Sequence, residues 1–313
     1  MANFSISPGV TLNEIDNTFL TGQPVQAGAA IIGPTVKGPV EIPTLITSYS
    51  DYVNRFGDTF ESGSLVHSFL TSTAAYSYFN NGGSSLLVTR VVSGSYTPST
   101  SSAIAGGTIA NAFSLETIGE GIIMNSTSSE GTGGVLSSGS KDNVRWEIAT
   151  SNTSSGNFTL LVRQGDDRNN KKMILESYNN VNLDPFSTRY VAKVIGDQKL
   201  AYNSSTNQLD ITGEYPNYSR YVRVKSVVTS TVDYLDENGN VRVPAASMSL
   251  PQPGSGSRQG GFGGGLDGFS GFDALGNHNG TKTGVTPANF YETITGGNSQ
   301  GFDIANAAAD QGQ

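Results

Sequence analysis

The apolar runs of this chain are short, rich in β-branched residues, and bounded by glycine or proline. Residues 29–32 form one such run, which stops at Gly33 and Pro34, and residues 86–92 form another after Gly83. Of the 313 residues, 39 are glycine and only 14% are charged. Serine, threonine, asparagine and glycine supply the polar bulk, and these residues are weak helix formers that favour turns. The pattern disfavours a helical bundle and favours short strands joined by turns.

Charge and missing residue types argue against several classes of function. The formal net charge is −8, whereas general binders of nucleic acid or anionic membranes need a positive field. The chain has no cysteine, which removes disulfides, thiol nucleophiles and cysteine–zinc sites. It shows no signal-peptide pattern, and no run approaches the ~18 apolar residues of a membrane span. We therefore expect a soluble protein, made in a cytoplasm, that binds neither nucleic acid nor membrane.

The first strand-like segment has β character but little apolar surface of its own. Its residues are Val10, Thr11, Leu12, Asn13, Glu14 and Ile15. The residues alone leave two interpretations open. The segment is either an edge strand of its own domain or an extended arm that adds a strand to the sheet of another molecule.

Residues 25–95 are predicted to form a compact αβ module. The run at 29–34 is typical of a buried strand, because small and β-branched residues end at Gly-Pro. A short helix is expected over 51–56, capped by Ser48 or Ser50.

Two further elements complete the module. A longer helix is predicted over 65–79, because its apolar residues follow one side of a helix. Residues 86–92 are almost continuously apolar, which predicts a central strand covered on both faces.

The composition changes at about residue 96, where a second, mostly β region begins and extends to about residue 250. Its predicted strands lie at 144–149, 158–163, 173–178 and 221–228. Residues 251–280 are glycine-rich with interspersed phenylalanines, which favours a flexible loop or linker. Further structure is expected to start after it.

A search for chemistry gives no site. The two histidines, His67 and His278, have no spacing that suggests a shared metal, and there is no G-x-S-x-G motif. The glycine-rich residues 254–268 contain no lysine and follow a proline-rich loop, unlike a phosphate-binding loop. Asp166 and Asp167 precede several basic residues, which favours a solvated charged hairpin tip over a cation site. We expect no catalytic residue, cofactor or metal, and no enzyme.

The N-terminal residues resemble the sheath proteins of phage contractile tails, through the order and spacing of several short motifs. The motifs are Ser-Pro-Gly-Val at 7–10, Asn-Glu-Ile-Asp at 13–16, Ala-Ala-Ile-Ile-Gly-Pro at 29–34, Lys-Gly-Pro at 37–39, Pro-Thr-Leu-Ile-Thr at 43–47, Tyr-Val-Asn-Arg-Phe-Gly at 52–57, Phe-Asn-Asn-Gly-Gly at 79–83 and Val-Thr-Arg-Val-Val at 88–92. Gly-Gly-Leu-Asp-Gly at 264–268 is similar to the opening of the family's central region.

The resemblance implies an α+β fold in four parts. An extended N-terminal arm is expected at 1–20 and a small αβ inner module at 21–98. A mostly β outer insertion domain follows at 99–250. Residues 251–313 are expected to hold a glycine-rich linker and the start of an α/β central domain that family members continue.

The resemblance also implies a function. Sheath subunits polymerise helically around an inner tail tube, and contraction drives that tube through the host envelope for genome ejection. The implied partners are further copies of the chain, the tail tube protein, and the baseplate and tail terminator proteins. The implied location is the virion tail, assembled in the host cytoplasm, and residues 10–15 would be the arm that exchanges strands between subunits.

An alternative treats the β region as a surface-exposed module that binds a receptor or carbohydrate. Tyr215, Tyr218 and Tyr221 motivate it, because aromatic side chains close together in the sequence would suit a binding face if exposed.

Overall fold

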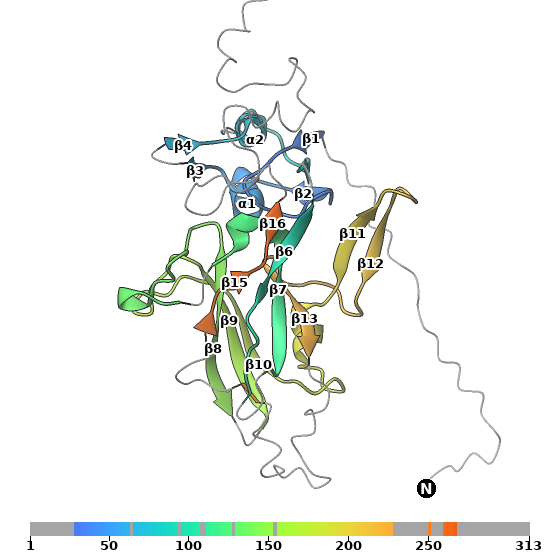
Figure 1. The fold of residues 1–313 in the computed structure, drawn as a ribbon. Coiled ribbons are helices and arrows are strands. Elements are labelled where there is room, and N and C mark those ends of the chain that lie inside the picture. The colour runs from blue at the N-terminus through green and yellow to red at the C-terminus, as the bar shows by residue number, and fades with distance from the viewer. Residues whose placement is uncertain are drawn as a thin grey trace, which may run out of the picture.

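A computed structural model describes residues 28–62, 65–92, 95–106, 111–126, 129–152, 155–227, 250–251 and 259–267. The described chain is α+β and mostly β, as predicted, with few helices and several sheets. Figure 1 shows a small αβ module above a larger β domain, from which one hairpin projects sideways. No helix in the described part of the chain is long and apolar enough to cross a bilayer.

The module is built on a three-stranded sheet. Its order is β1 (Ala29–Gly33), β5 (Leu86–Arg90) and β2 (Thr44–Ile46). The central strand β5 pairs in parallel with β1 and antiparallel with β2. The central position predicted for residues 86–92 is therefore confirmed for Leu86–Arg90. The predicted cover on both faces is wrong, because Leu87 and Thr89 are only half-buried.

Two helices pack on this sheet. In α1 (Tyr49–Phe56), Ser48 is the N-cap and its hydroxyl accepts a hydrogen bond from the Asp51 amide at 3.1 Å. Helix α2 (Leu70–Asn80) contributes Ala75 to the same small core. The predicted short helix and one of its two predicted caps are confirmed.

Two further predictions for the module are wrong. Residues predicted to begin the longer helix instead form β4 (Leu65–His67), which pairs with β3 (Phe60–Ser62), so the helix starts at Leu70. The spacing of their apolar residues fits a helix or a strand equally well, and pairing with β3 makes these residues a strand. Strand β1 was expected to be buried, but it lies at the edge of the described sheet, and Ile32 is 73% exposed.

The β domain contains two larger sheets. One has the order β10 (Ile174–Val181), β9 (Asn157–Gln164), β8 (Val144–Asn152) and β14 (Gln259–Gly260). The other has the order β13 (Val222–Val227), β7 (Phe113–Glu120), β6 (Tyr96–Ser101) and β15 (Phe262–Gly263), with β16 (Leu266–Asp267) also paired to β6. All strand pairs in both sheets are antiparallel.

One large core joins the sheets and reaches into the module. It includes Trp146, Phe113 and Phe158, and the rings of the two phenylalanines lie 5.5 Å apart between centroids. Val36 and Phe69 of the module belong to this same core. The module and the β domain are therefore packed together and not simply tethered.

Short elements connect the strands. They are two 3₁₀ turns, Ile122–Met124 and Thr132–Gly134, and the helix α3 (Val191–Ile195). After α3, the chain forms a separate two-stranded hairpin from β11 (Lys199–Asn203) and β12 (Gln208–Thr212).

The glycine-rich segment at 259–267 is part of the sheets, although the sequence favoured a flexible linker there. Strand β14 pairs with β8, and β15 and β16 both pair with β6. Figure 1 shows these orange strands running from β8 towards the module. An added Cβ at Gly261 would lie 2.1 Å from the Ser126 carbonyl oxygen, so close backbone approach explains this glycine. We call residues 259–267 the clasp.

Candidate assembly surfaces

The sheet of the module has one covered face and one open face. Leu86, Val88 and Ile46 are fully buried on the face that α1 and α2 cover. Because side chains alternate along a strand, the neighbouring residues lie on the other face. These are Ala30, Ile32, Leu45, Leu87 and Thr89, all of them exposed or half-buried. Among the described residues, no helix covers this largely apolar face.

A cleft lies between the module and the β domain. Four basic and two acidic side chains line it, namely Lys37, Arg55, Arg220, Arg223, Glu120 and Asp142. Lys37 and Asp142 pair at 3.3 Å, and Arg223 donates to Glu116 at 3.0 Å, so these charges are neutralised within the fold. Leu200 of β11 also lines the cleft, which therefore extends to the base of the hairpin.

Glu120 and Arg90 fasten the module to the end of β7. The carboxylate of Glu120 accepts a hydrogen bond from the Val40 amide at 2.6 Å. Arg90 Nη1 donates to the carbonyl oxygens of Gly38 and Glu120 at 2.8 and 2.6 Å. Burial raises the pKa of the Glu120 carboxyl, opposed by the Val40 hydrogen bond and the charges of Arg90 and Arg223.

This raised pKa predicts how stability depends on pH. A folded-state pKa above the ordinary value of 4.5 means that the folded chain holds the Glu120 proton more tightly than the unfolded chain. The contribution of Glu120 to stability is therefore fully present below about pH 4.5 and is lost as pH rises through the folded pKa. We expect urea denaturation across pH 4–8 to show this loss in the parent chain and not in Glu120→Gln. Equal pH profiles for the two chains would contradict the assignment.

The hairpin β11–β12 carries all its large apolar side chains on one face. Leu200 pairs with Ile211 and Tyr202 pairs with Leu209, and directly paired residues share a face. Tyr202, Leu209 and Ile211 are 40%, 41% and 49% exposed. The other face carries Lys199, Ala201, Asn203, Gln208, Asp210 and Thr212.

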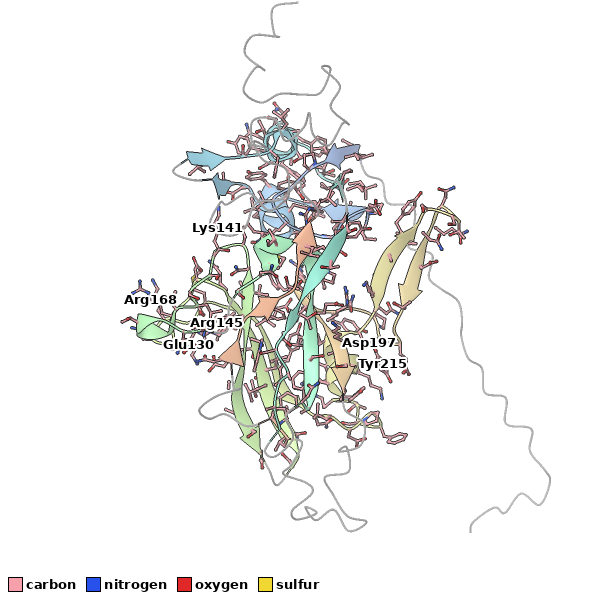
Figure 2. All side chains as sticks on the ribbon, viewed as in Figure 1. Glu130, Lys141, Arg145, Arg168, Asp197 and Tyr215 are labelled. Carbon is pink, nitrogen blue, oxygen red and sulfur yellow. The ribbon has the colours of Figure 1, made fainter. Side chains whose placement is uncertain are left out.

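An ion-pair network is buried against β8 and β9. Arg163 donates from Nε and Nη2 to the two carboxylate oxygens of Asp167, each at 2.7 Å, and both side chains are inaccessible to solvent. Arg145 lies 3.4 Å from Asp167 and also pairs with Glu130. Figure 2 places Arg145 and Glu130 together on this flank of the β domain.

The network corrects the prediction of a solvated tip at Asp166 and Asp167. Asp166 is exposed, but Asp167 is 3% exposed. Its partners come from strands β8 and β9, and the neighbouring Arg168 is exposed. Adjacent residues in a turn point in different directions, which spacing along the sequence does not reveal.

The other candidate residues do not come together in one site. The predicted arm, residues 10–15, lies outside the described residues, as does His278. His67 lies in β4. Of the three tyrosines that motivated a binding face, Tyr218 is 70% exposed. Tyr215 and Tyr221 pack against the large core, so the three do not form one aromatic surface.

Comparisons with known proteins give matches among solved structures alone. The chain matches no protein-family model and no curated protein sequence. A sheath tail protein from Listeria innocua matches with a TM-score of 0.35 and 9% identity, over 76% of this chain and 34% of that one. A sheath tail protein from Desulfitobacterium hafniense matches with a TM-score of 0.27 and 12% identity, over 74% of this chain and 40% of that one.

The chain thus spans 34% and 40% of the lengths of these two proteins. Both of these solved structures are sheath tail proteins, the family that the ordered motifs resemble.

Proposed function

We propose that the chain is a structural, non-catalytic subunit of a contractile tail sheath. In this role, copies of the chain polymerise helically around the tail tube and connect to the baseplate and tail terminator proteins. The location is the virion tail, after assembly in the host cytoplasm. Contraction of the sheath drives the tube through the host envelope.

The open apolar face of the module sheet carries this proposal. Strands β1 and β5 pair in parallel, an arrangement that is normally covered on both faces, and Ile32 of β1 is 73% exposed. Exposed apolar surface of this kind marks an interaction site. The face therefore suits a module that further protein completes, as a subunit of an assembly requires.

The position of the β domain supports the same role. The chain enters the domain through β6 and returns through β16, and these strands pair antiparallel at Thr97–Leu266 and Tyr96–Asp267. An insertion whose first and last strands lie side by side can be accommodated without separating the parts of the module. Contacts between copies that do not close a ring extend into a helix.

Electron microscopy of the purified, unsubstituted protein tests the function. We expect tubes or stacked rings, formed alone or around added tail tube protein. The matched variant is Ile32→Asp, which places a charge on the open face and is expected to reduce assembly, with the far-ultraviolet circular dichroism unchanged. If the unsubstituted protein stays monomeric both with and without the tube protein, the proposal is refuted.

A further inference from the structure

The most exposed large apolar side chain in the described part of the chain is Phe186, on the loop between β10 and α3. Its side chain is 93% exposed. Burial of an aromatic side chain is strongly favourable, so a ring left in water gives up that contribution to the fold. Single exposed apolar residues are common on protein surfaces, so exposure alone does not mark a site. The way in which the loop holds this ring is more informative.

Contacts at several points fix this loop. The Asp184 carboxylate accepts a hydrogen bond from the Phe186 amide at 2.9 Å, and Lys193 Nζ donates to the Pro185 carbonyl oxygen at 2.7 Å. The Lys193 ammonium also lies 5.6 Å from the centre of the Tyr215 ring, at the base of the hairpin β11–β12 (Figure 2). The backbone beneath the exposed ring is therefore fixed before anything binds it, which lowers the entropic cost of binding.

The cleft between the module and the β domain has the size and the lining to hold such a ring. Its volume is about 160 Å³. A cavity of about 150 Å³ with apolar walls can hold a benzene molecule. The apolar residues that line the cleft come from both parts of the chain and are Ile42, Ile118, Met124, Leu200 and Tyr221. Of the described residues that line the cleft, none belongs to the loop 182–190.

An arginine stands where the cleft opens to solvent. Arg220 lines the cleft, and its side chain is 61% exposed. Its Nη1 lies 3.8 Å from Asp51 Oδ1, an oxygen that also accepts a hydrogen bond from Arg55 Nε at 3.0 Å. This long contact with a shared oxygen leaves the flat face of the Arg220 guanidinium open to an aromatic ring, with which arginine pairs favourably. The cleft therefore offers apolar walls and a cation at its mouth.

The ring and the cleft belong to different surfaces of the chain, so a contact between them joins two copies. Phe186 does not occupy its own cleft, because it is 93% exposed on a fixed loop. A contact between two different surfaces is heterologous, and each copy that is added brings a further ring and a further cleft. Such a contact extends into a helical array unless its rotation closes a ring.

We propose that Phe186 of one copy inserts into the cleft of a second copy. There the ring packs on Ile118, Met124 and Tyr221, and the guanidinium of Arg220 stacks on its face. The inference rests on the proposed function for its choice of a second copy, and it assigns the β domain a direct contact between subunits.

Photo-crosslinking in the full chain tests the inference. One copy carries the photoreactive residue p-benzoyl-phenylalanine in place of Phe186, and it is irradiated together with an isotope-labelled, unsubstituted copy. We expect cross-links to the cleft residues of the labelled copy, at least about tenfold more abundant than from the same photoreactive residue in place of Met173. Met173 is a matched control, because it is 48% exposed on the β domain and does not line the cleft.

Substitutions test the contributions of the ring and of the cation. Phe186→Ala is expected to raise the concentration at which half of the chains self-associate by about thirtyfold, as for loss of an interface hot-spot residue. Arg220→Gln is expected to raise it by about threefold, as for loss of an exposed cation–π contact. The double variant should show only the effect of Phe186→Ala, because the contribution of Arg220 depends on the ring. Sedimentation velocity measures the association, and unchanged far-ultraviolet circular dichroism shows that the variants fold.

Three outcomes would overturn the proposal. They are cross-links within the irradiated copy, cross-links mainly outside the cleft or to added tail tube protein, and association of Phe186→Ala at the same concentration as the unsubstituted chain. Additive effects of the two substitutions would contradict the stacking of Arg220 on the ring. Electron microscopy of the same samples separates this inference from the function. Tubes without cleft cross-links refute this contact alone, and cleft cross-links without tubes refute the sheath function alone.

Discussion

Asp167→Ala is expected to lower the free energy of unfolding by about 2–3 kcal/mol, because it removes the charged hydrogen bonds of a buried carboxylate and leaves Arg163 with Glu147 and Arg145 with Glu130 as their remaining partners. The Asp167 carboxylate is shared by Arg163 at 2.7 Å and Arg145 at 3.4 Å, and all three side chains are fully buried. It also accepts a hydrogen bond from the Met173 amide at 2.9 Å, which holds the turn after β9.

The adjacent residue provides a matched control. Asp166 is exposed, and its carboxylate accepts a hydrogen bond from the Gln164 side chain. Asp166→Ala is therefore expected to change stability by less than about 0.5 kcal/mol. Trp146 is the single tryptophan and lies in the same sheet, so its fluorescence in urea reports both variants. Equal effects of the two substitutions would show that the network does not stabilise the fold.

Phe262→Ala is expected to lower the free energy of unfolding by about 3–5 kcal/mol, as for other large core aromatic residues. Phe262 is 2% exposed in the middle of the clasp and belongs to the large core. Its amide donates to the Ser126 hydroxyl, and its carbonyl accepts from the Ser126 amide at 2.7 Å. Loss of the side chain should therefore release the clasp from both sheets.

Phe186→Ala is the control for this prediction, since Phe186 is 93% exposed. We expect it to leave the free energy of unfolding unchanged within about 0.5 kcal/mol. Limited proteolysis adds a local measurement, because release of the clasp should accelerate cleavage beside Leu266 by thermolysin in Phe262→Ala and not in Phe186→Ala. Unchanged cleavage and stability in Phe262→Ala would mean that the clasp does not depend on this side chain.

The sequence predicted those parts of the fold that local residues determine. The helix α1 depends on an N-cap and an apolar face that lie within nine consecutive residues, Ser48 to Phe56. Both can therefore be recognised directly in the sequence. The strands β8, β9 and β13 were expected from alternation and β-branched residues. The series of motifs also indicated an αβ module followed by a β region, and the structure has both.

Contacts between distant residues could not be predicted in this way. Burial of Asp167 depends on Arg145, which β8 contributes from the other strand of the hairpin. The clasp depends on pairing of Leu266 with Thr97 and of Gly260 with Trp146. A run of glycines is expected in a flexible linker, and it is equally expected where one backbone segment must pass close to another segment. Alternation along the sequence shows which residues of one strand share a face. Which residues of β11 and β12 share the apolar face of the hairpin is known only once the strand register is known.

The clasp has a consequence for the order of folding. Strands β6 and β8 have partners in residues 259–267, which the chain supplies more than a hundred residues later. Pairing over such separations is slow, and a chain synthesised from its N-terminus exposes the edges of β6 and β8 until then. Exposed edges readily pair with other chains. The β domain is therefore completed only after residue 267 is available, so chains ending before the clasp are expected to aggregate.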